Sequence, residues 1–201
     1  MLKGTWLIPV LCSGVALCAQ SLGDLNGLAQ AAAHFCSHGM AAGRDPGTAA
    51  LYRITGDQGG AAPSPMTKGV DVTHWSFQYK LVAVGTDPGP DGGLAVPESI
   101  HQGVLAECTR GIFGKFQYST ALVTDARSLE YTWIAISLDD ALAQVKAHGY
   151  SGTFEKVTLM RPMNPSIPDE YVYIFDCPAD HVRVAISTQT GALMWTEKYR
   201  C

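Results

Sequence analysis

Two histidines and two aspartates have the types and spacing that could hold a metal ion. His34 and His38 stand four residues apart, the spacing of two ligands on one face of a metal-binding helix. No third ligand is evident near them, so we expect two solvated histidines. Asp87 and Asp91 could both reach a calcium ion, but their loop lacks the number of oxygen ligands that calcium needs. The sequence therefore favours a turn there and predicts no metal site.

Residue patterns typical of catalysis do not occur in the sequence. It contains no glycine-rich phosphate loop, no GxSxG and no HExxH. Asp139 and Asp140 are adjacent in a predicted helix, where neighbouring residues do not face each other. We expect them to complement the positive end of a helix capped by Ser137. The sequence thus predicts no enzyme, no catalytic residue and no cofactor.

The first 19 residues predict export from the cell. Lys3 is followed by a short apolar run and by a small-residue exit at Ala19, the pattern of a cleavable signal peptide over residues 1–19. The run is shorter than the roughly 20 apolar residues that span a bilayer. An uncleaved anchor and lipid attachment at Cys12 or Cys18 are alternatives, although leucine precedes each cysteine where a small residue is usual. We expect a periplasmic or secreted protein without an integral membrane span after cleavage.

Cysteine usage fits an oxidising compartment. Four cysteines remain after cleavage: Cys36, Cys108, Cys177 and Cys201. An even count in an exported chain suggests two disulfides, and no CxxC is present to suggest zinc. We expect Cys36–Cys108, which joins an apolar helix stripe to the strand face beneath it. We also expect Cys177–Cys201, because a hairpin with Val184 opposite Trp195 brings these two cysteines near each other.

Charge and composition exclude some partners. Loss of Lys3 leaves 13 of the 14 basic residues against 18 acidic ones, a formal charge of −5. No basic cluster occurs, so nucleic acid is not an expected partner. A chain with 47% hydrophobic and 16% charged residues is globular in composition.

The elements that would position these residues recur in two copies. Residues 28–38 and 142–152 are identical at six of eleven positions, and each predicts a helix. A strand, a proline-bearing loop, an aromatic strand and a hairpin follow each helix. The first copy has them at 50–55, 56–71, 75–81 and 104–118, and the second at 155–160, 161–169, 171–177 and 182–196. The sequence predicts an α+β fold of two tandem modules, 20–128 and 129–201, each with one helix packed on a small antiparallel sheet.

The second copy resembles a known family. Ile136 to Leu142 at the helix start and Val182 to Gly191 at the hairpin are similar to the PepSY domain, which occurs in propeptides of thermolysin-type peptidases and in exported bacterial proteins. Ser187 stands where that family usually has an aspartate. The resemblance covers about residues 136–198 and implies a PepSY- or cystatin-like module without catalytic residues.

These features lead to a functional hypothesis with open alternatives. We expect an exported, non-catalytic binding module, inhibitor-like or chaperone-like, whose partner is a protein such as a peptidase or an envelope protein. One alternative is a structural subunit of an envelope or surface assembly. Another is an enzyme or small-ligand binder that uses the concave face of a curved sheet.

One sheet face of the second copy is a candidate interface. In the first copy the residues facing away from the helix are polar: His74, Ser76, Gln78 and Lys80. In the second copy they are apolar: Val172, Ile174, Ala185 and Met194. A sheet with one solvated face should alternate apolar and polar residues. We expect this face to contact the first module or a partner, unless residues 131–136 cover it.

Overall fold

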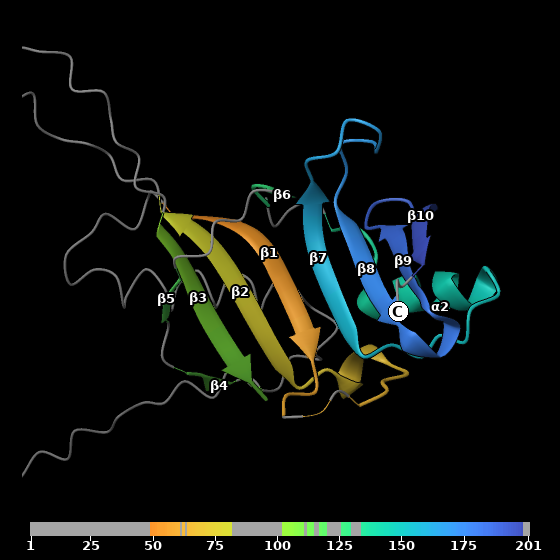
Figure 1. Cartoon of the computed structure of the whole chain (residues 1–201), viewed down its shortest axis with the longest axis horizontal. Helices are drawn as coiled ribbons and strands as arrows, with labels where there is room; N and C mark the ends of the chain where they lie inside the picture. The colour runs from red at the N-terminus through yellow and green to blue at the C-terminus, as the bar shows by residue number, and fades with distance from the viewer. Residues whose placement is uncertain are drawn as a thin grey trace, which may run out of the picture.

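The structure is a computed structural model of the chain (Figure 1). It describes residues 49–60, 62, 64–81, 102–110, 112–114, 117–119, 126–129 and 134–198. Several predictions from the sequence fall outside these residues: the helix over 28–38, the histidines His34 and His38, the aspartates Asp87 and Asp91, and the signal segment 1–19.

About half of the described residues belong to strands. The strands of the first half are β1 (Ala49–Asp57), β2 (His74–Leu81), β3 (Gln102–Thr109), β4 (Ile112–Phe113) and β5 (Gln117–Ser119). The short β6 is Ala126–Arg127. The second half consists of helix α2 (Leu138–Ala147) and strands β7 (Lys156–Pro162), β8 (Val172–Cys177), β9 (Val182–Ser187) and β10 (Leu193–Lys198). Two 3-10 helices are η2 (Gly69–Asp71) and η4 (Pro178–Asp180).

The two halves share one antiparallel sheet. Its order is β10-β9-β8-β7-β1-β2-β3-β4, with β5 on β3 and β6 on β7. The first strands of the halves, β1 and β7, pair with each other at the middle of the sheet, with Ile54 opposite Leu159 and Thr55 opposite Thr158 (Figure 1). We call this pairing the seam. The strand order is therefore mirrored on its two sides.

The predicted fold of two tandem helix-on-sheet modules is wrong. The described chain is β-rich, with one α-helix and a sheet that continues through both halves. The physical reason is that β1 and β7 would each leave one edge with unpaired amides and carbonyls if the two four-strand units were separate. The seam satisfies these edges by joining β1 to β7. Local sequence patterns specify strands but carry no signal for a pairing about a hundred residues apart.

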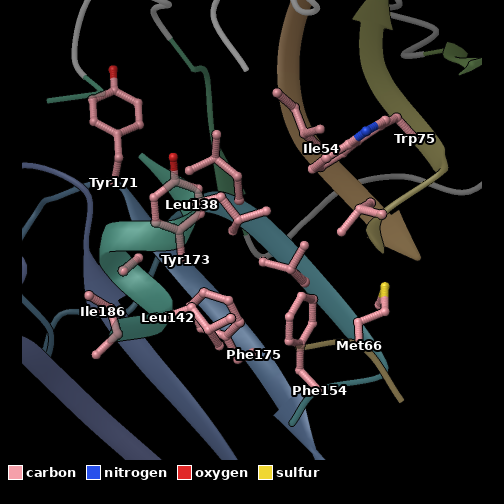
Figure 2. Close-up of a cluster of buried hydrophobic side chains, with 14 of the residues drawn as sticks. Ile54, Met66, Trp75, Leu138, Leu142, Phe154, Tyr171, Tyr173, Phe175 and Ile186 are labelled. Carbon is pink, nitrogen blue, oxygen red and sulfur yellow. The ribbon is translucent and has the colours of Figure 1, made fainter. Parts of the chain in front are cut away.

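A single hydrophobic core lies on one face of this sheet. It contains Ile54 and Trp75 from the first half together with Tyr173, Phe175 and Ile186 from the second. Helix α2 lies against the β9 end of the sheet and buries the apolar stripe Leu138, Ala141, Leu142 and Val145 (Figure 1). In Figure 2, Phe154 lies between Phe175, whose ring it meets edge-on at 5.3 Å, and Met66.

Contacts away from the seam also tie the halves together, and two of them come from the loop after β1. Met66, from the loop after β1, exchanges both backbone hydrogen bonds with Phe154, at 2.7 and 3.0 Å. The Gly69 amide donates to Asp139 Oδ1 at 2.6 Å. Asp139 thus binds the other half of the chain, in addition to lying in the first turn of α2.

Local predictions from the sequence are confirmed at the second helix. Ser137 Oγ accepts from the Asp140 amide at 3.1 Å, and Asp140 closes the capping box through the Ser137 amide. The hairpin turn between β9 and β10 ends at Gly191, whose φ of 72° is favourable for glycine. Ser187 Oγ accepts from the amides of Gln189 and Thr190, at 3.2 and 3.1 Å. These bonds are the ones an aspartate would accept in such a turn.

Candidate binding face

The face of the sheet opposite α2 carries the alternate side chains of each strand. We call it the open face, because no helix of the described residues covers it. On β8, for example, Tyr173 and Phe175 enter the core, while Val172 and Ile174 belong to a separate cluster with Met160. In the second half the open face is organised in rows that cross the strands.

The first row consists of charged residues. Lys156, Asp176, Arg183 and Glu197 are register partners along β7, β8, β9 and β10. We call them the charged row. Their signs alternate, and Arg183 Nε donates to Asp176 Oδ1 at 2.9 Å. Arg183 Nη1 lies 3.7 Å from Glu197 Oε2. Such exposed pairs contribute little stability, about 0–1 kcal/mol each.

The next row alternates in size. Thr158, Ile174, Ala185 and Trp195 are register partners along the same four strands. We call them the size row, because its members are small, large, small and large in turn. Trp195 Nε1 is buried and has no hydrogen-bond acceptor within the described part of the chain. An unsatisfied buried donor typically costs about 1–3 kcal/mol.

A hollow of about 760 Å³ lies over these rows. Its floor includes Met160, Ile174 and Trp195, and one wall comes from the β7–β8 loop through Met163 and Ile167. Met163 is a large hydrophobic residue that is 54% exposed. This volume and mixed lining are within the usual range of binding sites.

The β7–β8 loop that forms the wall is anchored by one aspartate. Asp169 accepts from Arg161 Nε and Nη2 at 2.8 and 2.6 Å, and from Arg127 Nη1 at 2.7 Å. Hydrogen bonding from Arg161, helped by the charges of both arginines, lowers the pKa of the Asp169 carboxyl. The Arg161 guanidinium also lies 5.6 Å from the ring centre of Tyr171.

The predicted interface residues all lie on the open face, but only two of them are reachable. Val172 and Ala185 are 0% exposed, whereas Ile174 and Met194 are half-buried. The described residues of the first half join the second half at the seam, and Tyr52 of β1 packs against the cluster of Met160 and Val172. Ile134 and Ile136 pack on the opposite, core face, so these residues of segment 131–136 do not cover it.

Sequence reasoning missed Trp195 because of a β-bulge. The predicted register set Trp195 opposite Val184, in the core. In the structure the register shifts between Leu193 and Trp195, and Trp195 pairs with Ala185 on the open face. A bulge adds one residue to a strand and so reverses the side on which later side chains lie. Met160 was recoverable from period-2 alternation along β7, but Met163 lies in a loop without a pattern.

Two of the four predicted disulfide cysteines are described. Cys108 is buried in the core, as its strand face predicted. Cys177 is a free thiol, with Sγ 3.8 Å from the Phe175 carbonyl oxygen, so its expected bridge to Cys201 is not formed in this structure. Burial, with the nearby charges of Asp180 and Asp176, raises the pKa of the Cys177 thiol to about 12. Cys36 and Cys201 lie outside the described residues, and the pairing Cys36–Cys108 stays a prediction.

A second hollow, of about 700 Å³, lies where the strands end beside the seam. It is lined by polar groups that include Asp57, His74 and Glu155, and His74 Nδ1 lies 3.0 Å from Asp57 Oδ1. Among the described residues, no three His, Cys, Asp or Glu side chains are placed to hold a metal ion. No helix that the structure describes is long and apolar enough to cross a membrane.

Comparisons with known proteins give little guidance. No family model and no curated protein matches the chain. Among solved structures, the chain is similar to a protein of Clostridium difficile 630 described as a "putative lipoprotein". The two share 9% identity over 90% of this chain and 97% of the other, with a TM-score of 0.49. A likeness at this level carries no argument about fold or function.

Proposed function

We propose that this protein is an exported, non-catalytic binding module that contacts a protein partner through the open face of its second half. The observation that carries the proposal is the group of apolar side chains around the hollow: Ile174, Trp195 and the exposed Met163. Burying one such side chain is worth roughly 1.5–3 kcal/mol. Tryptophan is also enriched among the residues that dominate protein interfaces.

Two features of the sequence support the rest of the proposal. The signal-peptide pattern of residues 1–19 supports export to a periplasmic or secreted location. The PepSY likeness of residues 136–198 supports an inhibitor-like or chaperone-like role, with a peptidase or envelope protein as partner.

Site-specific photo-crosslinking in the producing cell tests this proposal. A benzophenone amino acid at Met163 should give covalent adducts with a protein. The same amino acid at Ile112, which is 71% exposed at the β3–β4 hairpin, serves as the control and should give none. Ile174→Asp should abolish the adduct at position 163, whereas Ile112→Asp should preserve it, because only Ile174 lines the hollow. Equal adducts at both positions would refute the proposal.

Thermal melting separates loss of contact from loss of fold. Ile174 packs against the small cluster of Met160 and Val172, so Ile174→Asp could lower the melting temperature. Met163→Asp replaces a side chain that is more than half exposed and should leave the melting temperature unchanged. If Met163→Asp melts like the parent and also retains every contact of the open face, the proposal is wrong.

A further inference from the structure

The charged row of the open face is complementary to a second copy of itself. The charged row reads positive, negative, positive, negative from Lys156 on β7 to Glu197 on β10. A row of four alternating charges is complementary to its own reverse. Two such rows laid face to face in opposite directions pair every cation with an anion.

The size row has the same property. It reads small, large, small, large, from Thr158 through Ile174 and Ala185 to Trp195. Its reverse sets Ile174 against Ala185 and Trp195 against Thr158. Large side chains then face small ones at every position, which is the condition for two sheet faces to interdigitate.

One symmetry operation reverses both rows together. A two-fold axis that lies between two facing sheets, parallel to the strands and between β8 and β9, exchanges β7 with β10 and β8 with β9. Each row then meets its own reverse, and the same surface is used on both subunits, as in most homodimers. From this we infer that the partner on the open face of the second half is a second copy of the chain. This inference rests on the proposed function, since it assumes that the open face is a protein contact.

The remaining charges near the charged row fit this arrangement. Asp57 and His74 lie across the seam on β1 and β2 and bind each other at 3.0 Å. Arg53, which also lines the hollow, lies on β1 as well. In the dimer these three residues extend beyond the partner's β10, so they oppose none of the charged residues on the partner's described strands of the second half. The inner pair, Asp176 and Arg183, is already bonded within one subunit. The outer charges, Lys156 and Glu197, are exposed. Lys156 of each subunit would face Glu197 of the other, so the dimer would contain this contact twice.

A charge swap tests the inference by sedimentation velocity on the purified chain. The parent should form a dimer at about 100 µM, and Lys156→Glu or Glu197→Lys should each weaken it about tenfold, because two attractions become repulsions. The double variant Lys156→Glu with Glu197→Lys no longer alternates along the row, but it again sets opposite charges against each other across the interface. It should return the dissociation constant to within about threefold of the parent value. Lys146→Glu, an exposed reversal on α2, should leave dimerisation unchanged.

Each outcome is decisive. A parent that sediments as a monomer overturns the inference. A double variant as weak as the single variants, or an equal loss in Lys146→Glu, overturns it as well. Glu197→Lys keeps the test valid if Lys156→Glu melts early, because Glu197 is 61% exposed on the edge strand. If the chain is a monomer and position 163 still crosslinks to a different protein, the inference of a second copy is wrong and the proposed function stands. If position 163 crosslinks to nothing, both are wrong.

Discussion

In the first half of the sheet the open face of β2 carries His74, Ser76 and Gln78, whereas in the second half β8 carries Val172 and Ile174 on the same face. The opposite, core faces of these strands are alike, with Trp75 and Phe77 matching Tyr173 and Phe175 as buried aromatics. The shared core face is required by folding. The open face is not required by folding, so its composition is free to differ, and the half-buried Ile174 on this face supports the proposed contact surface.

The halves also differ in what the structure shows over their core faces. Helix α2 covers the second half, and the loop of the first half that carries Met66 and η2 packs beside it. The first half therefore contributes to the packing of the second. This asymmetry indicates that the halves are not independent units, although their strand orders mirror each other.

Isolating one half gives the largest expected effect. A fragment of residues 129–201 lacks the β1 partner of β7, the Met66 partner of Phe154 and the core residues Ile54 and Trp75. These losses should exceed the roughly 5–15 kcal/mol that stabilises a typical domain. We expect no cooperative melting by circular dichroism, and recovery of a melt when residues 20–128 are added. A fragment that melts cooperatively alone would show that the halves are independent.

Much of the local structure was predictable, and the reason it was incomplete is physical. Period-2 alternation correctly placed both aromatic strands, and the capping box of Ser137 correctly placed the start of α2. The seam was not predictable, because pairing of two exposed edges depends on contacts far apart in sequence. The sequence correctly predicted an apolar residue on the open face at Ile174. It carries no local pattern that predicts the bulge before Trp195 or the hydrogen bond from Gly69 to Asp139.

Gly56 tests how tightly the first half packs beside the seam. A Cβ at this position would lie 2.6 Å from Trp75 Cζ3 and 2.7 Å from Val72 Cγ1. Overpacking of this kind costs about 1–3 kcal/mol, so Gly56→Ala should lower the free energy of unfolding by that amount in urea. Gly114→Ala is the matched control, because its nearest contact is the Glu107 carbonyl oxygen at 3.8 Å. Equal stability of the two variants would mean that β1 and β2 adjust freely.

Asp139 tests the tie between the halves. Asp139→Ala removes the acceptor 2.6 Å from the Gly69 amide and should cost about 1–2 kcal/mol in chemical unfolding. Asp139→Asn keeps an oxygen that can accept this bond and should cost less. If the two substitutions were equally costly, the effect would come from the charge at the helix end rather than from the contact between the halves.

The smallest effects are expected in the two loops that follow β1 and β7, each of which is held by an aspartate. Asp71 accepts from the amides of Thr67 and Lys68, at 2.9 and 3.0 Å, and these bonds lower its pKa. The pKa of Asp169 is lowered mainly by the bond from Arg161. A carboxyl whose pKa is lowered by folding stabilises the fold above its unfolded pKa, and this contribution is lost as the pH falls through the folded value. Both loops should therefore loosen only below about pH 4, the ordinary carboxyl range.

Salt should distinguish these two loops where acid does not. The partners of Asp169 are two charged arginines at the surface, and added salt screens such pairs. The partners of Asp71 are mainly backbone amides, whose short hydrogen bonds are screened less. Amide hydrogen exchange at neutral pH should thus rise with salt in residues 163–168 but not in residues 67–70. Asp169→Asn should remove the salt response while Asp71→Asn leaves it in place. Asp169 is exposed and Asp71 half-buried, and both aspartates lie in loops, so neither variant should move the melting temperature noticeably. A large shift for Asp169→Asn would show that the wall of the hollow is part of the folded core rather than a separately anchored loop.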